Sequence, residues 1–125
     1  MALGPVALVG YGWTKERLRR QFQTEVDLRN CHVILVDGDE AGYISIEHRI
    51  TLWYVDAIAI VPNFQRSGVG AAAMRQVFEE AGARPVRLSV LRTNRARSLY
   101  ARLGFRVIGG DRQRELMEWR RATSS

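Results

Sequence analysis

The sequence predicts a mixed α/β fold in which helices flank a sheet that contains both antiparallel and parallel strands. In the first half of the chain, two segments rich in apolar residues stand either side of a short Asp37-Gly38-Asp39 turn, which indicates an antiparallel hairpin. In the second half, segments with strand and helix periodicity alternate, which indicates a right-handed β-α-β crossover and therefore parallel strands. The length of 125 residues fits a single domain over residues 1–125.

One short helix and three strands are expected in the first half. The helix is predicted over residues 17–22, after Thr14 as a candidate N-cap, because Leu18 and Phe22 lie on one helical face. The three strands are predicted over residues 31–36, 42–48 and 52–61, and residues 6–9 are a candidate for an abbreviated first strand. Pro62 ends the third strand because proline cannot donate to a strand ladder.

Helices and strands alternate in the second half. Small and apolar residues recur with the period of an α-helix over residues 68–82, and Gly82 is the expected stop. A second helix is predicted over residues 96–103, closed by Gly104. Strands over residues 86–91, 105–108 and 116–119 complete the chain, with a turn at Gly109-Gly110 and a frayed tail over residues 120–125.

The charge of the chain indicates a polyanionic partner. The formal net charge is +6, and every basic residue except Lys15 is arginine. Because arginine forms planar, bidentate contacts with phosphate, nucleic acid and a phosphate-bearing cofactor are both candidates. The alternative is that arginine simply replaces lysine on a solvated surface.

Cysteine content and hydropathy indicate a cytoplasmic protein that does not cross a membrane. The single cysteine, Cys31, cannot form an intramolecular disulfide, and no Cys/His cluster has the spacing of a metal site. No apolar stretch reaches the roughly 18 residues that a membrane span requires.

The junction between the strand at 52–61 and the helix at 68–82 carries a pattern typical of phosphate binding. Gly68 and Gly70 stand where the helix begins, and Arg66 adds a positive charge. The first amides of a helix have no intrahelical partner and lie at the positive end of its dipole. Taken alone, a glycine-rich turn with a purely structural purpose explains the pattern equally well. The glycine spacing matches neither the Walker A loop nor the dinucleotide fingerprint.

Two motifs carry a resemblance to a known family. The segment Gln65-Arg66-Ser67-Gly68-Val69-Gly70 resembles the Gln/Arg-x-x-Gly-x-Gly/Ala motif of the GNAT superfamily of N-acetyltransferases. Asn94 followed by Ala96, Leu99-Tyr100 and Leu103-Gly104-Phe105 is similar to the family's Asn…Ala…Leu-Tyr-x-x-Leu-Gly-Phe segment. The resemblance spans about residues 31–119. It implies an acyl-CoA N-acyltransferase-like fold, a twisted and mostly antiparallel sheet with a central parallel pair flanked by helices, here with a shortened N-terminal region.

The resemblance also implies acetyl-CoA as co-substrate and no metal. The strands at 52–61 and 86–91 would splay apart and receive the pantetheine arm between them. Backbone groups of the first strand would contact the pantetheine and thioester, and the amides of residues 66–71 would hold the pyrophosphate. The implied cofactor-binding residues are Ile58, Ile60, Val61, Gln65, Arg66, Ser67, Gly68, Val69, Gly70, Ala71 and Asn94.

Three residues are candidates for the proton transfers of an acetyl transfer. Tyr100 matches the family tyrosine that protonates the departing thiolate, and its alternative role is that of a core aromatic. The base is either Asp56, which shares the pleat parity of Ile58 and Ile60, or Glu47 on the neighbouring strand. Many relatives carry a strand glutamate at a position that corresponds to Ala59 or Tyr54 here, so the base stays open.

Two functions remain open from the sequence. The leading one is transfer of an acetyl group to a primary amine of a small molecule or a protein, and the other is a non-catalytic, CoA-binding regulatory module. A nucleic-acid-binding domain rests on charge alone and is not expected. Because a shortened N-terminus would leave a sheet edge unpaired, a homodimer is expected.

Overall fold

The computed structural model of the chain describes residues 5–10 and 31–122. These residues form one seven-stranded sheet with the strand order β1-β2-β3-β4-β5-β7-β6. Neighbouring strands are antiparallel except β4 and β5, which are parallel, so the predicted mixed sheet with a central parallel pair is confirmed. The elements are β1 (Val6–Gly10), β2 (Cys31–Val36), β3 (Asp39–His48), β4 (Trp53–Ile60), the 3-10 turn η3 (Pro62–Phe64), α2 (Val69–Ala81), β5 (Val86–Leu91), α3 (Ala96–Leu103), β6 (Arg106–Gly110) and β7 (Arg114–Trp119).

The first half forms the predicted hairpin and also contains the candidate first strand. Asp37 and Gly38 both have positive φ angles, 51° and 84°, as a two-residue hairpin turn requires. Asp39 therefore pairs directly with Val36, and β3 begins three residues earlier than predicted. β1 pairs antiparallel with β2 and forms one edge of the sheet. The helix predicted over residues 17–22 lies outside the described residues.

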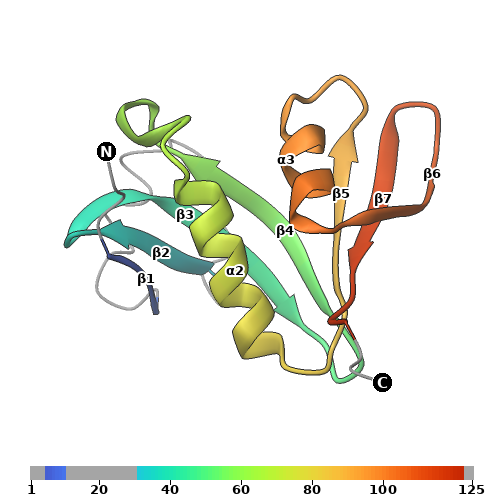
Figure 1. Ribbon diagram of the computed structural model, residues 1–125, viewed down its shortest axis with the longest axis horizontal. Helices are drawn as coiled ribbons and strands as arrows, with labels where there is room; N and C mark the ends of the chain where they lie inside the picture. Colours follow the sequence, from blue (N-terminus) through green and yellow to red (C-terminus); the bar gives the residue numbers. More distant parts are fainter. Residues whose placement is uncertain (1–4, 11–30, 123–125) are drawn as a thin grey trace.

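Both helices of the described residues pack on the sheet through one shared core. Gly68 and Gly82 flank α2 and Gly104 ends α3, as the sequence predicts. Apolar residues of the two helices and of strands β2 to β5 and β7 form this core. Figure 1 shows α2 lying along the sheet and α3 beside the end of β5. This arrangement places the start of α2 and the start of α3 at the same end of the parallel pair.

The last hairpin turns at a different place from the one predicted. Gly109 and Gly110 belong to β6, and the chain reverses at residues 111–113. Asp111 forms this turn, because its Oδ1 accepts hydrogen bonds from the amides of Gln113 and Arg114, each at 2.8 Å. Gly110 does not form the turn. It allows β6 and β7 to approach closely, since a Cβ there would overlap the backbone carbonyl of Arg114.

The start of the predicted tail is anchored. The Arg121 guanidinium donates hydrogen bonds to the carbonyl oxygens of Phe78, at 2.7 Å, and Gly82, at 3.1 Å. These bonds satisfy two of the last carbonyl groups of α2, which have no partner within the helix. The prediction of a frayed tail is therefore wrong for Arg121.

Candidate functional site

The parallel strands β4 and β5 pair over only three positions and then diverge. The pairs are Trp53 with Val86, Tyr54 with Arg87 and Val55 with Leu88. Figure 1 shows the two strands together at one end and apart at the end where α3 lies. A cavity of about 160 Å³, here called the splay cavity, lies between them. Its lining residues are Val55, Asp56, Ala57, Ile58, Leu88, Ser89, Val90, Leu91, Asn94, Tyr100 and Arg114.

A β-bulge places Asp56 on the wall of the splay cavity. In the ladder between β3 and β4, Ser45 pairs with Ala57 and Ile46 pairs with Val55, so Asp56 is an extra residue. The bulge interrupts the alternation of the strand. Val55, and not Asp56, packs in the same core as Ile58, and Asp56 is exposed. The predicted shared parity of Asp56 with Ile58 and Ile60 is therefore wrong, although Asp56 lines the cavity.

Beyond the bulge, every second residue of β4 directs its backbone N–H and C=O groups toward the gap between β4 and β5. The Val61 N–H donates to the Ala41 carbonyl on the β3 side, at 2.8 Å, and the Val61 carbonyl accepts from the Phe64 amide, at 2.9 Å. Because alternate residues of an antiparallel strand direct their backbone groups to opposite sides, those of Ile58 and Ile60 point away from β3. Ile58 and Ile60 thus have the orientation expected from the sequence. Val61 differs, because its N–H is directed toward β3 and is bonded there. The carbonyl of Ile60 is also engaged, since it accepts a hydrogen bond from Gln65 Nε2.

A second cavity, about 330 Å³ in volume and here called the loop cavity, lies at the start of α2. Its lining residues are Ile60, Phe64, Gln65, Arg66, Gly68, Val69, Gly70, Ala71, Leu99 and Arg102. Arg66 and Gly68 have positive φ angles, 61° and 88°, which turn the chain sharply into the helix. The first backbone bond of α2 runs from the Ala72 amide to the Gly68 carbonyl, at 3.0 Å.

The amides of the loop cavity are suited to binding an anion. Within the described ranges, none of the amides of residues 66–71 donates to a backbone carbonyl. Such amides at a helix N-terminus, together with the positive charges of Arg66 and Arg102, favour a phosphate or another anion. Side chains brace the loop from within: Gln65 Nε2 donates to the Ile60 carbonyl at 3.0 Å, and the Ser67 hydroxyl donates to the Phe64 carbonyl.

Tyr100 is both a core aromatic and a wall of the splay cavity. The residue is 7% exposed, and its ring meets that of Phe105 edge-on, with centroids 5.6 Å apart. Burial raises the pKa of the Tyr100 hydroxyl above its ordinary value. The hydroxyl therefore remains protonated at neutral pH, as a proton donor must. The two roles expected for Tyr100, core aromatic and proton donor, are therefore compatible.

Glu47 is less suited than Asp56 to accept a proton at this site. Its side chain is 43% exposed and accepts two hydrogen bonds from Arg49, at 2.8 and 3.0 Å. These bonds lower the pKa of the Glu47 carboxyl, and the positive charge of Arg49 also lowers it. Burial raises this pKa, but by less than the hydrogen bonds lower it. Glu47 does not line the splay cavity, whereas Asp56 does.

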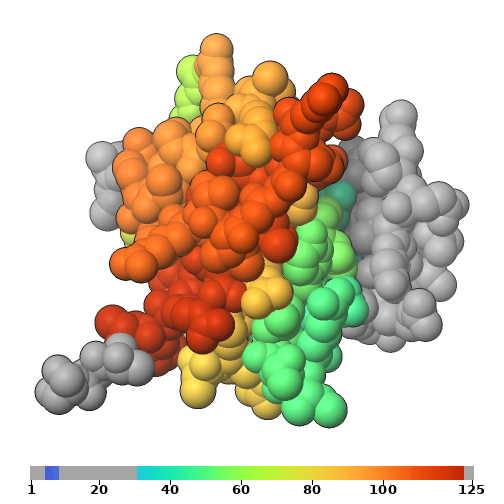
Figure 2. Space-filling view, turned by 90° about the vertical axis from the view of Figure 1, so that its right-hand side faces the viewer, coloured from blue at the N-terminus to red at the C-terminus, as the bar shows by residue number. Residues whose placement is uncertain are grey.

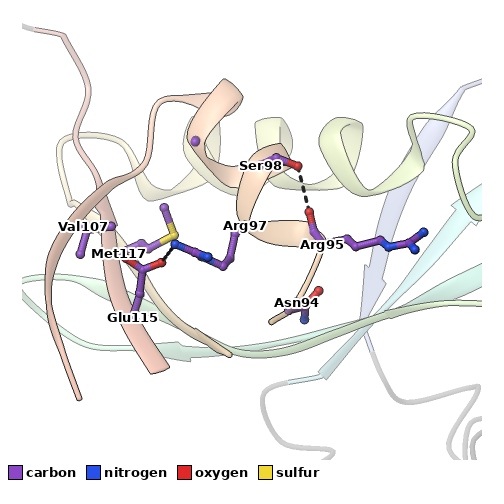
Figure 3. A pocket seen from close by; sticks show the side chains of 8 residues that line it. Asn94, Arg95, Arg97, Ser98, Val107, Glu115 and Met117 are labelled. Carbon is purple, nitrogen blue, oxygen red and sulfur yellow. Dashed lines mark hydrogen bonds and ion pairs between the residues drawn. The ribbon is translucent and has the colours of Figure 1, made fainter. Parts of the chain in front are cut away.

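Asn94 lies two residues before α3 and lines two cavities. Its Oδ1 accepts a hydrogen bond from the Ala96 amide at 2.8 Å, which satisfies one of the free amides at the start of the helix. Asn94 also lines the splay cavity and a third cavity of about 420 Å³ between α3 and the β6–β7 hairpin. In that third cavity, Figure 3 shows the buried Glu115 in an ion pair with Arg97.

Several residues of these cavities carry no signal in the sequence. Ser89 and Arg114 reach the splay cavity because β5 and β7 are paired, with Leu91 opposite Arg114. Arg102 reaches the loop cavity from α3, which lies close to the start of α2, and Phe64 reaches it from η3. Only the spatial arrangement of separate elements identifies them.

Over residues 5–10 and 31–122, no three His, Cys, Asp or Glu side chains converge as metal ligands would. No helix within these same ranges has the length and apolar character needed to cross a membrane.

Comparisons with known proteins identify the family. The sequence pattern of the acetyltransferase (GNAT) domain matches residues 27–107. The fold is similar to an acetyltransferase from Thermus thermophilus, with a TM-score of 0.77 at 15% identity, covering 96% of this chain and 99% of that one. It is also similar to the ribosomal-protein-S18-alanine N-acetyltransferase from Escherichia coli, with a TM-score of 0.74 at 16% identity and 97% of each chain covered.

A third similar structure is the PaiA N-acetyltransferase from Thermoplasma acidophilum in complex with coenzyme A. Its TM-score is 0.63 at 20% identity, and the match covers 86% of this chain and 68% of that one. No curated protein matches the chain in a sequence search. Because the domain pattern covers more than half of the 125 residues, the chain belongs to the GNAT family of acetyltransferases.

Proposed function

We propose that the protein transfers the acetyl group of acetyl-CoA to a primary amine of a small molecule or a protein by direct attack. The observation that carries the proposal is the splay cavity, where the exposed carboxylate of Asp56, the buried hydroxyl of Tyr100 and the open side of β4 meet. Each is a group that the reaction needs; Asp56 and the open backbone come from β4, whereas Tyr100 comes from α3.

The residues around the two cavities fit the parts of acetyl-CoA. The pyrophosphate would accept hydrogen bonds from the amides of residues 66–71, with Arg66 and Arg102 supplying positive charge. The pantetheine arm would lie along β4, where Ile58 and Ile60 direct backbone groups into the opening. Asn94 and Gln65 would border the arm at either end, since each lines one of the cavities.

The chemistry requires two proton transfers. The nitrogen of a neutral amine attacks the thioester carbonyl carbon, and a backbone N–H of β4 donates to the oxygen as it becomes negative. Asp56 accepts the proton of the new ammonium group, directly or through water. The C–S bond then breaks, Tyr100 donates its proton to the thiolate, and exchange with solvent restores both side chains.

We also propose a homodimer of a single-domain cytoplasmic protein, with the contact at β6 instead of the N-terminal edge. β1 already occupies the N-terminal edge of the sheet. At the opposite edge, Val107 and Ile108 of β6 are 52% and 46% exposed. Figure 2 shows the face on which this hairpin lies, in orange to red. An unpaired apolar strand edge is a surface that a second copy can cover. The buried Cys31 is the single cysteine of the chain and cannot form an intramolecular disulfide, which is consistent with a reducing compartment.

The proposed function is tested by CoA binding and by thiol release. We expect calorimetry to detect CoA binding, with about 10-fold weaker affinity in Arg66→Gln because a cation beside the phosphates is lost. Arg75→Gln is the matched control, since Arg75 is an exposed arginine of α2 outside the loop cavity. Thiol release from acetyl-CoA with a panel of amines should fall about 100-fold in Asp56→Asn and little in Glu47→Gln.

A folded protein that gives no heat with CoA would contradict the proposal. The assignment of the base would fail separately if Glu47→Gln were the variant that loses activity.

A further inference from the structure

Arg114 stands on the wall of the splay cavity that faces Asp56. Asp56 comes from β4, whereas Arg114 is the first residue of β7 and pairs with Leu91 at the end of β5. The splay cavity is therefore lined by an acidic residue from β4 and by a basic residue from β7. The chemistry of acetyl transfer proposed above uses Asp56 and Tyr100 but gives Arg114 no role.

Unlike those of Arg87 and Arg97, the guanidinium of Arg114 has no hydrogen-bond acceptor within the described ranges, and its charge interacts with the nearby carboxylate of Asp111. Arg87 donates to Glu118 at 2.7 Å, and Arg97 forms an ion pair with Glu115. For the exposed side chain of Arg114, no hydrogen bond or ion pair joins the guanidinium to another residue of the described ranges. Its five N–H donors are thus available to a ligand in the cavity.

The backbone at Arg114 is held in place, so its side chain starts from a defined point. Asp111 Oδ1 accepts the Arg114 amide at 2.8 Å, and the Asp111 amide donates to the Arg114 carbonyl at 2.9 Å. The Arg92 amide donates to the Gln113 carbonyl at 2.9 Å, which ties the turn to the end of β5. A fixed anchor lowers the conformational entropy that binding would remove.

The phosphates of CoA do not account for Arg114. The loop cavity, which carries Arg66 and Arg102, shares no lining residue with the splay cavity. The two sets of cations therefore serve different spaces. A cation in the splay cavity, where the thioester and the amine must meet, is placed for a negative charge on the acceptor.

We propose that the acceptor is a small amine that carries an anionic group, a carboxylate or a phosphate, and that Arg114 binds this group while the amine lies toward Asp56. The proposal rests on the proposed function and names its substrate class. Guanidinium binds carboxylate and phosphate in bidentate geometry, so opposite charges on opposite walls orient such an amine. The cavity volume of about 160 Å³ favours a small acceptor.

The test compares matched amines with and without the anion. Amino acids are paired with their carboxamides, and phosphoethanolamine is paired with ethanolamine, so that the two arms distinguish carboxylate from phosphate. We expect the wild-type protein to prefer the anionic member of at least one arm by about 10- to 100-fold in kcat/KM. Arg114→Gln should abolish that preference through the KM of the amine, while the KM of acetyl-CoA is unchanged.

Two variants control for a general effect of charge. Arg114→Lys keeps the charge but not the bidentate fork, so it should restore only part of the preference. Arg112→Gln removes a neighbouring exposed arginine that does not line the cavity, and the preference should remain. Equal use of neutral and anionic members by the wild-type protein, or an equal loss in Arg112→Gln, would overturn the proposal.

A binding measurement covers the case in which no amine of the panel is acetylated. The Nε–Hε signal of Arg114 in the NMR spectrum of the CoA-bound protein is assigned by its loss in R114Q. An anionic amine should shift this signal and its neutral counterpart should not. If no anionic amine shifts it, the proposal is overturned, whereas heat on titration with CoA would leave the proposed function standing.

Discussion

At the scale of single residues, burial determines what Tyr100 can do. The side chain is buried beside the splay cavity, and this burial raises the pKa of its hydroxyl above the ordinary value of about 10. A phenol in this state can donate a proton across the whole physiological range. Asp56 illustrates the converse, because this residue of the bulge is exposed at the wall of the splay cavity.

Tyr100→Phe tests this role. The variant retains the aromatic ring that packs on Phe105 but loses the proton donor. We expect kcat to fall about 10- to 100-fold, with little change in the melting temperature. Because the raised pKa keeps the wild-type hydroxyl protonated from pH 6 to about pH 9, the ratio of the two rates should be constant over this range. Steady-state kinetics against pH provides the measurement, and an unchanged kcat would assign Tyr100 to packing alone.

At the scale of elements, the wall of the splay cavity depends on how closely β3 and β4 approach. Gly42 makes the approach possible, because a Cβ there would overlap the Ala59 carbonyl and lie 3.0 Å from the Ile60 Cα. Both obstacles are backbone atoms and cannot rotate away. The segment of β4 that lines the site is therefore held in place by a residue with no side chain.

We expect Gly42→Ala to lower the free energy of unfolding by about 2–4 kcal/mol and to weaken CoA binding. Gly70→Ala is the matched control, since its Cβ would meet only the Leu99 side chain, at 3.7 Å, in an α-helix that favours alanine. Its stability should be equal or up to about 1 kcal/mol higher. Urea unfolding of both variants makes the comparison, and equal stability of the two would contradict the steric argument.

At the scale of the whole molecule, Glu118 links β5 to β7 and to the C-terminal segment. It is buried and accepts hydrogen bonds from Arg87, its partner in the β5–β7 ladder, and from Arg120. Burial alone raises the pKa of Glu118, but the hydrogen bonds from Arg87 and Arg120 and their charges outweigh it, so the net shift is downward. A carboxyl with a lowered folded-state pKa stabilises the fold above its unfolded pKa of about 4.3.

This stabilisation should disappear as the pH falls through the lowered pKa of Glu118. We expect the free energy of unfolding of the wild-type protein to decrease below about pH 4.5, and Glu118→Gln to reduce that decrease. At pH 7 the variant should lose about 1–2 kcal/mol, because both arginines keep some access to solvent. Urea unfolding from pH 3 to 7 measures both effects. Identical pH profiles for the two proteins would show that Glu118 does not carry the dependence.

Local chemistry in the sequence determined most of the elements. The Asp37-Gly38 hairpin, the glycines on either side of α2 and the strand stop at Pro62 depend on the conformations of a few adjacent residues. The two motifs that identify the family are short for the same reason. Their glycines and neighbours act on the backbone nearby, so they can be read without knowing the fold.

The details of the site depend on contacts between distant parts of the chain. Pairing with β3 creates the bulge at Asp56 and engages both backbone groups of Val61 together with η3. Pairing of β5 with β7 brings Arg114 to the splay cavity, and the turn at Asp111 moves Gly109 and Gly110 into a strand. Each of these outcomes depends on a partner distant in the sequence or on the register of a whole ladder. Local residue preferences hold no information about that partner, so they predict the elements, whereas the packing between elements sets the geometry of the site.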